Sequence, residues 1–152
     1  MSLEGTLTTS IHEQIMVGGL AIRPRIEPDQ SAGAVAIHEF DVPAGAGLPV
    51  PHSHDAYEET IYGVRGTVTF TVEGTAHDIG PGETLFIARG EVHAFANNGT
   101  IDATALAIIT PGLLGADYFR EMAAIIDAAA GGPPDLAAIG DVMRRHGLTP
   151  AV

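Results

Sequence analysis

The chain has 152 residues, no cysteine and a formal net charge of −12. That length suits one domain, and the acidic balance argues against nucleic acid and anionic membranes as partners, because both need a basic face. Without cysteine there is neither a disulfide framework nor a thiolate metal site, so any metal would have to be bound by His, Asp and Glu. We find no signal peptide and no apolar run long enough to span a bilayer, so a cytoplasmic location is the expectation.

The first part of the chain predicts short strands separated by turns. The sequence is 45% hydrophobic and contains 19 glycines and 10 prolines, a composition typical of many short strands joined by tight turns. Residues 6–11 are a candidate edge strand, and residues 32–42 alternate well enough for a longer strand. On the longer strand His38 and Phe40 share one face. If that face is inward, His38 looks into the barrel; a hydrogen-bonded or solvent-facing His38 is the alternative.

Two histidines, His52 and His54, follow a loop rich in glycine and proline. On an extended strand they point to the same face, so their imidazoles can converge on one point. Glu58 and Glu59 come next and face opposite ways, because they are adjacent on a strand. One carboxylate and a third imidazole from another strand would complete a four-ligand site for Zn, Fe, Mn, Ni or Cu. Taken alone, such a pair of histidines is more often a pair of surface residues beside an acidic loop.

The next fifty residues continue the strand pattern. Val68, Phe70 and Val72 alternate with threonines, which predicts a half-buried strand with a polar outer face. Further strands are expected at residues 84–88, 92–97 and 101–110. The second of these places His93 and Phe95 on one face. About eight strands with no long helix before residue 112 indicate an all-β sandwich or barrel.

The spacing of these residues resembles that of the cupin family. In the first stretch, His52-Ser53-His54 is followed by four residues, Glu59, six residues and Gly66. In the second, Gly82 is followed by five residues, Ala88-Arg89-Gly90, two residues, His93, three residues and Asn97. Two positions depart from the family pattern: Ala46 stands where the first motif opens with glycine, and Ala88 stands where the second has proline. Both positions affect turns and not ligands.

The resemblance implies a cupin double-stranded β-helix, that is, a jelly-roll barrel, over residues 1–111, with motifs at 46–66 and 82–97. It also implies one divalent metal ion per chain, either Fe, Mn, Ni, Zn or Cu. The implied ligands are His52, His54, Glu59 and His93. Glu59 is preferred over Glu58 because it keeps the six-residue gap to Gly66, and Asn97 is expected to form a turn. The family likeness further implies a homodimer.

Residues 112–152 predict a helical extension that packs on the barrel or on a partner subunit. A helix is expected at 117–130, with Phe119, Met122 and Ile126 on its apolar stripe, and a second at 135–146. A helix-turn-helix DNA reader is conceivable, but the net charge argues against it. The tail loosely resembles that of small cupins similar to quercetin dioxygenase.

Three functions are compatible with such a site. Four protein ligands leave one or two positions open on a five- or six-coordinate metal, and an open position distinguishes a catalytic from a structural site. The first hypothesis is a metal-dependent dioxygenase with Glu59 as ligand and proton acceptor. The others are a metal-dependent isomerase or lyase of a sugar or keto acid, and a small-molecule binding or sensing module. The substrate pocket is expected to be formed by His38, Phe40, Phe70 and Phe95, with Phe86 as a further candidate wall.

Overall fold

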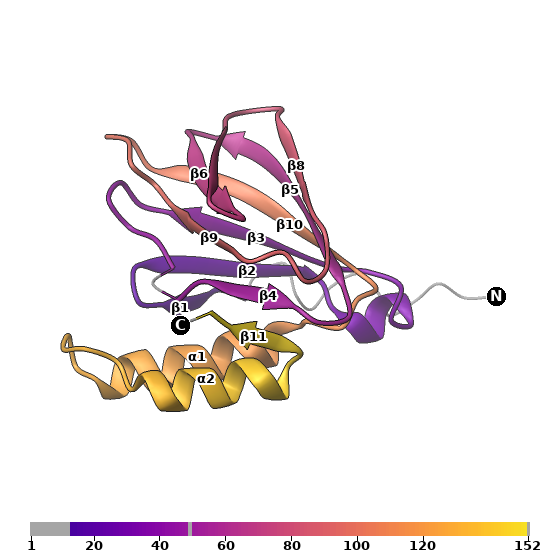
Figure 1. Ribbon diagram of the computed structural model, residues 1–152, viewed down its shortest axis with the longest axis vertical. Coiled ribbons are helices and arrows are strands. Elements are labelled where there is room, and N and C mark those ends of the chain that lie inside the picture. The colour runs from indigo at the N-terminus through magenta and orange to yellow at the C-terminus, as the bar shows by residue number, and fades with distance from the viewer. Residues whose placement is uncertain (1–12, 49, 152) are drawn as a thin grey trace.

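Two antiparallel sheets lie face to face, and two helices lie across one end of the sandwich (Figure 1). The structure is a computed structural model that describes residues 13–48 and 50–151. The larger sheet has the order β1 (Ile15–Val17), β2 (Leu20–Ile26), β3 (Ala36–Val42), β10 (Ala103–Thr110), β5 (Glu58–Arg65), β8 (Thr84–Ile87). The smaller has the order β11 (Leu148–Pro150), β4 (His52–His54), β9 (His93–Ala96), β6 (Val68–Val72), β7 (Thr75–Ile79). The predicted all-β architecture with two C-terminal helices is confirmed.

The register of the smaller sheet brings the two histidine motifs together. Strands β4 and β9 are neighbours, and His52 lies directly opposite His93. On its other side β9 pairs with β6, where Phe95 lies opposite Phe70. Directly opposed residues on paired strands point to the same face of the sheet. The sheet therefore presents imidazoles and phenyl rings side by side on its inner face.

Strict alternation along the strands forms the core. Every second residue of β3 is buried, from Ala36 to Val42, and β6 buries Val68, Phe70 and Val72. The threonines between them face outward, and Thr69 donates a hydrogen bond of 2.7 Å to Asp78 on β7. Burial of one large apolar side chain contributes about 1.5–3 kcal/mol. The inner faces of the two sheets therefore hold the sandwich together. They also form walls of the cavity between the sheets.

Two strand predictions need comment. The strand expected at residues 32–42 begins only at Ala36, because the chain before it forms a short 3-10 helix, η1 (Pro28–Ser31), closed by Ala32 in a left-handed conformation (φ 53°). A left-handed residue cannot continue an extended strand. The edge strand expected at residues 6–11 lies outside the described residues.

The glycine that closes the first motif, Gly66, is required by its geometry. Its φ is 63°, and a Cβ atom at this position would lie 2.6 Å from the carbonyl oxygen of Asp102. Only glycine tolerates this combination of positive φ and close backbone approach. This turn ends β5, the strand that carries the predicted carboxylate ligand, and leads the chain into β6 of the other sheet.

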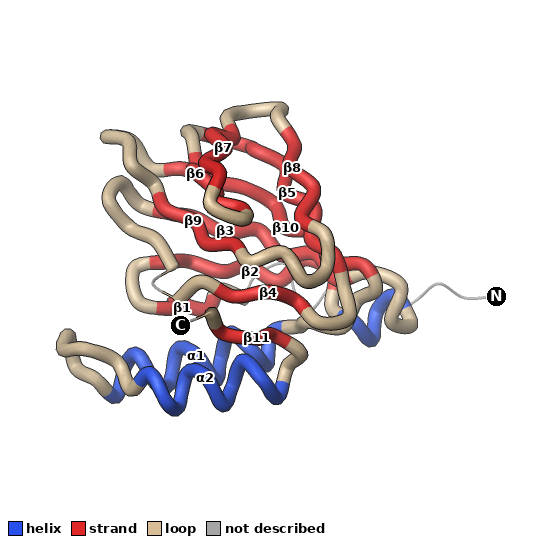
Figure 2. The backbone as a smooth tube through the Cα atoms, in the orientation of Figure 1, coloured by secondary structure: helices blue, strands red, loops and turns tan. Residues whose placement is uncertain are grey.

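The C-terminal extension packs on the barrel of its own chain. Helix α1 (Ala116–Ala128) lies against β1, and α2 (Leu136–Arg145) lies beside α1 (Figure 2). The chain then returns as β11, which pairs with the histidine strand β4 and places Leu148 opposite His54. Tyr57 fixes this return by donating a hydrogen bond of 3.0 Å to the carbonyl of His146. Neither helix in the described part of the chain is long and apolar enough to cross a membrane.

Candidate metal centre

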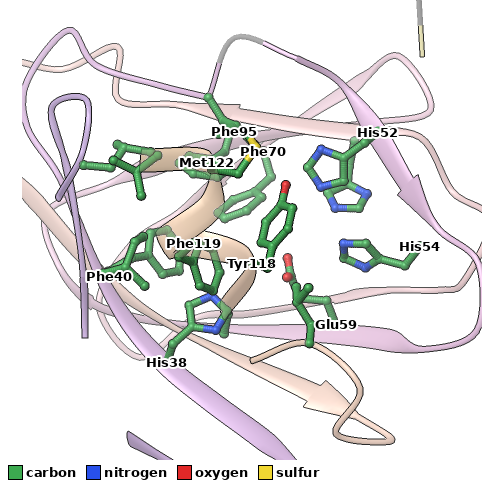
Figure 3. A pocket seen from close by; sticks show the side chains of 17 residues that line it. His38, Phe40, His52, His54, Glu59, Phe70, Phe95, Tyr118, Phe119 and Met122 are labelled. Carbon is green, nitrogen blue, oxygen red and sulfur yellow. The ribbon is translucent and has the colours of Figure 1, made fainter. Parts of the chain in front are cut away.

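Three histidines converge on one point inside the sandwich. His52 and His54 come from β4, and His93 comes from the neighbouring strand β9. One nitrogen from each ring can be chosen so that all three lie within 4.8 Å of one another. All three residues are buried, with exposed fractions of 6%, 2% and 3%. Figure 3 shows the rings of His52 and His54 directed toward the same end of the cavity.

Backbone carbonyls orient two of these rings. The Nδ1 atom of His52 lies 3.1 Å from the carbonyl oxygen of Val50, and Nδ1 of His93 lies 2.9 Å from that of Glu91. A neutral imidazole that donates through Nδ1 presents the lone pair of its other nitrogen, Nε2. This is how metal-ligating histidines are usually fixed. The ring of His54 is held differently, by stacking on Tyr57 at a centroid distance of 4.6 Å.

Two buried ring nitrogens have no hydrogen-bond partner among the described residues. They are Nδ1 of His54 and Nε2 of His93. Buried polar atoms are nearly always paired, so two orphaned ring nitrogens in one three-histidine cluster call for an explanation. A divalent ion that accepts one ring-nitrogen lone pair from each histidine would give a partner to every nitrogen that faces it. The imidazole set thus fits a metal of the Zn, Fe, Mn, Ni or Cu group.

The surroundings of His52 and His54 keep these two imidazoles neutral. Burial, together with repulsion from neighbouring histidines, lowers the pKa of His52 to about 4 and that of His54 to about 2. At neutral pH these rings therefore carry no proton on the nitrogen that would bind a metal. Deprotonated nitrogen is the form that metals bind.

Glu59 approaches the histidines from the opposite sheet. It lies on β5, lines the same cavity, and its carboxylate points toward the histidine end in Figure 3. Burial raises the pKa of Glu59, and the nearby His93 partly offsets the effect. The group of potential ligand atoms that lie within 4.8 Å of one another comprises the three imidazoles and does not include the Glu59 carboxylate. Its predicted role as fourth ligand therefore stays a prediction.

The neighbouring carboxylate, Glu58, points the other way. It forms a two-pronged ion pair with Arg89 outside the cavity, with distances of 2.8 and 2.9 Å. The Arg89 guanidinium holds the pKa of Glu58 below its usual range. Strand alternation thus separates the two adjacent acids as the sequence predicted, with Glu59 on the cavity side.

The cavity is largely apolar. Its volume is about 60 Å³, counted as the space open to the centre of a water molecule. The four residues expected to form the substrate pocket all line it: His38, Phe40, Phe70 and Phe95. The expectation that Phe86 is a wall is wrong, because this side chain is 61% exposed on the outer face of β8. One water needs roughly 10–15 Å³ of such space, so the cavity suits a ligand of a few heavy atoms.

His38 and Asn97 have different surroundings. His38 faces inward and is buried, with its ring 4.7 Å from that of Phe119, and burial lowers its pKa to about 4. Asn97 is not part of the cavity lining: its amide donates to the carbonyls of Val42 at 2.9 Å and Ile101 at 2.8 Å. It closes a turn, as expected.

Helix α1 adds three cavity residues that the sequence did not assign to the pocket: Tyr118, Phe119 and Met122. Phe119 and Met122 belong to the predicted apolar stripe. The sequence thus predicted that these side chains are buried, but not that they line this cavity. Tyr118 was missed altogether. A phenol one position before an apolar stripe is a signal for a polar group at the edge of a buried face.

An antiparallel sandwich with a buried three-histidine cavity defines a class of small metal-binding barrels. Residues 38–109 match the Cupin domain family, in agreement with the resemblance that the two motifs predicted. A predicted oxalate decarboxylase from Thermotoga maritima is similar in structure: TM-score 0.59, 25% identity, 65% of this chain and 90% of that chain covered.

Two further solved structures share the fold. KdgF from Halomonas sp. has a TM-score of 0.58 at 19% identity, with 66% of this chain and 86% of that chain covered. A sugar phosphate isomerase from Silicibacter pomeroyi has a TM-score of 0.54 at 20% identity, with 62% and 60% covered. No curated protein matches the sequence. The similarities therefore establish the fold and leave the reaction to be argued from the site.

Proposed function

We propose that this chain is a metal-dependent enzyme of the dioxygenase type that acts on a small organic molecule in the histidine-lined cavity. The observation that carries the proposal is the convergence of three buried imidazoles, two of them with orphaned nitrogens, inside an apolar cavity. A structural zinc site would be closed and often uses thiolates, which this sequence lacks. Three or four protein ligands instead leave room on the ion for a substrate oxygen.

The chain's own residues have separate tasks in this proposal. His52, His54 and His93 bind the ion, and Glu59 serves as fourth ligand and as proton acceptor. The phenyl rings of the cavity exclude water, which strengthens every electrostatic interaction inside it. A divalent ion would supply a Lewis acid, and Fe, Mn, Ni or Cu would add redox chemistry with O2.

A non-oxidative reaction is the second candidate, that is, an isomerase or lyase acting on a small keto acid or sugar. Two observations favour it. The cavity of about 60 Å³ is small, and the 25% identical structure is described as a predicted oxalate decarboxylase. Such a reaction would use the ion only as a Lewis acid and would not consume O2.

Metal reconstitution separates these functions. Apo-protein would be loaded in turn with Fe, Mn, Ni, Cu and Zn and offered catechol, small β-diketones, small keto acids and oxalate. O2 uptake that disappears in Glu59→Ala and persists in the matched exterior variant Glu58→Ala supports the dioxygenase. Turnover that continues unchanged under argon contradicts it and supports the isomerase or lyase. Metal-dependent binding without product under every metal supports a binding or sensing module.

We also propose a homodimer. Tyr62, Val64 and Phe86 are 42%, 42% and 61% exposed, and they lie on the same outer face of β5 and β8. Strand β8 is also the edge of the larger sheet, and such edges are usually paired or covered. A second copy of this chain on that face would cover both features. Light scattering should give twice the chain mass at micromolar concentration and the mass of one chain for Phe86→Ser; a monomer mass for the unaltered chain contradicts the proposal.

A further inference from the structure

The chain has three tyrosines, and their hydroxyls have three different environments. Tyr57 is buried and bonded to the carbonyl of His146. Tyr62 is 42% exposed on the outer face of β5. Tyr118, in the first turn of α1, is 4% exposed, and its hydroxyl is buried without a hydrogen-bond partner among the described residues. Of the three, only Tyr118 has an unexplained polar atom.

The orphaned hydroxyl points into the metal cavity. Tyr118 lies between the phenyl rings and the histidines in Figure 3, beside the carboxylate of Glu59. A phenylalanine would fill the same space without burying an unpaired hydroxyl, as the adjacent Phe119 does. Unpaired buried hydroxyls are unfavourable and uncommon, so the hydroxyl marks a position where a ligand atom completes the hydrogen bond.

The cavity offers few other groups that could donate to a ligand. Tyr118 carries the only hydroxyl among the described residues that line it, and no lysine or arginine lines it. Burial and the nearby Glu59 raise the pKa of Tyr118, so the phenol keeps its proton at neutral pH and remains a donor. The three converging histidines are assigned to the ion, which leaves the phenol of Tyr118 and the imidazole of His38 as groups that could donate a second contact. The His38 ring packs edge-on against Phe119, with a centroid distance of 4.7 Å, and of these two groups only the phenol has an orphaned buried polar atom.

We propose that Tyr118 is a specificity-determining residue that donates a hydrogen bond to a second oxygen of a ligand whose first oxygen binds the metal. Small α-keto acids, and related molecules with two neighbouring oxygens, have this arrangement. The inference rests on the proposed metal site and names the substrate class for it. Because α1 lies outside the matched Cupin domain at residues 38–109, this contact is contributed by the extension and not by the barrel.

The test uses two probes on the Co(II)-loaded protein, whose visible absorption reports ligands of the ion. Pyruvate presents two neighbouring oxygens, whereas imidazole binds a metal through nitrogen and then accepts no hydrogen bond. Tyr118→Phe should weaken pyruvate binding about 10- to 100-fold, the range expected for a lost hydrogen bond to a charged acceptor. Imidazole affinity, metal content and folding should be unchanged. The matched variant Tyr62→Phe should bind both probes as the unaltered chain does.

Each failure has its own meaning. Equal pyruvate affinity in Tyr118→Phe and the unaltered chain overturns the role of Tyr118, as does an equal loss of imidazole binding. If the unaltered chain binds imidazole but not pyruvate, the ligand class is wrong. If neither probe changes the Co(II) spectrum of the unaltered chain, the ion has no open position, and the proposed enzyme function fails together with this inference.

Discussion

Polar groups on the outer face of the larger sheet have hydrogen-bond partners, whereas several polar groups inside the cavity have none among the described residues. On the outer face, Arg23 donates to both oxygens of Asp41 at 2.7 and 2.6 Å and to Glu39 at 2.7 Å. In the cavity, nitrogens of His54 and His93 are orphaned. Polar groups that satisfy one another stabilise a fold, whereas buried groups left unsatisfied are available to a ligand. On this basis the Arg23 cluster is interpreted as structural and the histidine cluster as the candidate functional site.

The strongest test of this contrast is removal of the imidazoles. His54→Ala or His93→Ala should reduce the metal content from about one ion per chain to near zero, because each removes one of three converging ligands. Elemental analysis of protein purified without an affinity metal column measures it. His77→Ala, on the edge strand β7 and outside the cavity lining, is the matched control. Undiminished metal in both ligand variants would show that the cluster is not the site.

The adjacent acids Glu58 and Glu59 sharpen the contrast within a single strand. Glu59→Gln should weaken metal binding by about tenfold or more and yet stabilise the metal-free protein by roughly 1–3 kcal/mol, since it removes a half-buried carboxylate whose charged form is disfavoured by burial. The burial-raised pKa of Glu59 gives the sign: the cost exists above that pKa and disappears as pH falls through it.

Glu58→Gln is the matched control for that prediction. Its carboxylate is bonded to Arg89 on the exterior, so the change should leave metal affinity unaltered and should not stabilise the protein. Metal titration and urea unfolding in the presence of a chelator measure both properties. A metal-free Glu59→Gln protein that is less stable than the unaltered chain would mean that the carboxylate already has a stabilising partner.

His38 gives a pH-dependent version of the same test. Its folded pKa, about 4, lies below the ordinary value of 6.5, so the unfolded chain takes up the proton first as the solution is acidified. Stability is therefore lost as pH falls from about 6.5 to about 4. At pH 4.5 the loss from this residue should be roughly 2–3 kcal/mol. The unfolding free energy of the metal-free protein, measured with urea, should fall by that much less between pH 7 and 4.5 in His38→Leu than in the unaltered chain. His77→Leu should show the same fall as the unaltered chain. Parallel pH profiles for His38→Leu and the unaltered chain would contradict the lowered pKa.

Residues whose positions depend on local sequence patterns were predicted from the sequence, and residues whose positions depend on exact strand boundaries were not. The candidate ligand histidines and the alternation on β3 were predicted because spacing and alternation are local properties, whereas which face of β3 lies inward was left open. Phe86 was assigned wrongly because a strand shifted by one residue reverses every side chain, and on β8 the neighbouring Ile87 takes the buried position. Whether a residue lines the cavity therefore depends on where its strand begins and ends, and not on whether its side chain is aromatic.

The C-terminal contribution to the site depends on docking, which no local pattern encodes. Strand β11 is only three residues long and forms because α2 returns the chain beside β4. Tyr118 reaches the cavity because α1 crosses the open end of the sandwich next to β1. The helices were predicted from their apolar stripes, but the surface that each stripe would meet was not. Long-range packing therefore adds the residues that distinguish this cavity.

The outer cluster yields the smallest expected effect. Arg23→Met should destabilise the fold by about 1–3 kcal/mol at pH 7, because it removes the guanidinium shared by the partly buried Asp41 and Glu39. Asp41 then keeps the hydrogen bond from Thr104, and Glu39 keeps the longer contact with Arg25. Metal content should not change. The pKa of Asp41 is lowered mainly by Arg23, so this contribution is present above the ordinary pKa of about 3.9 and is lost as pH falls through the lowered folded value.

The difference in unfolding free energy between Arg23→Met and the unaltered chain should therefore narrow below about pH 4. Arg144→Met is the control, because its ion pair with Asp141 is exposed, at 3.3 Å, and pairs of this kind contribute less than about 0.5 kcal/mol. Equal losses in the two variants would mean that the Arg23 cluster is no more than a surface ion pair. A loss of metal in Arg23→Met would mean that the two regions are coupled, and the separation between a structural and a functional cluster would fail.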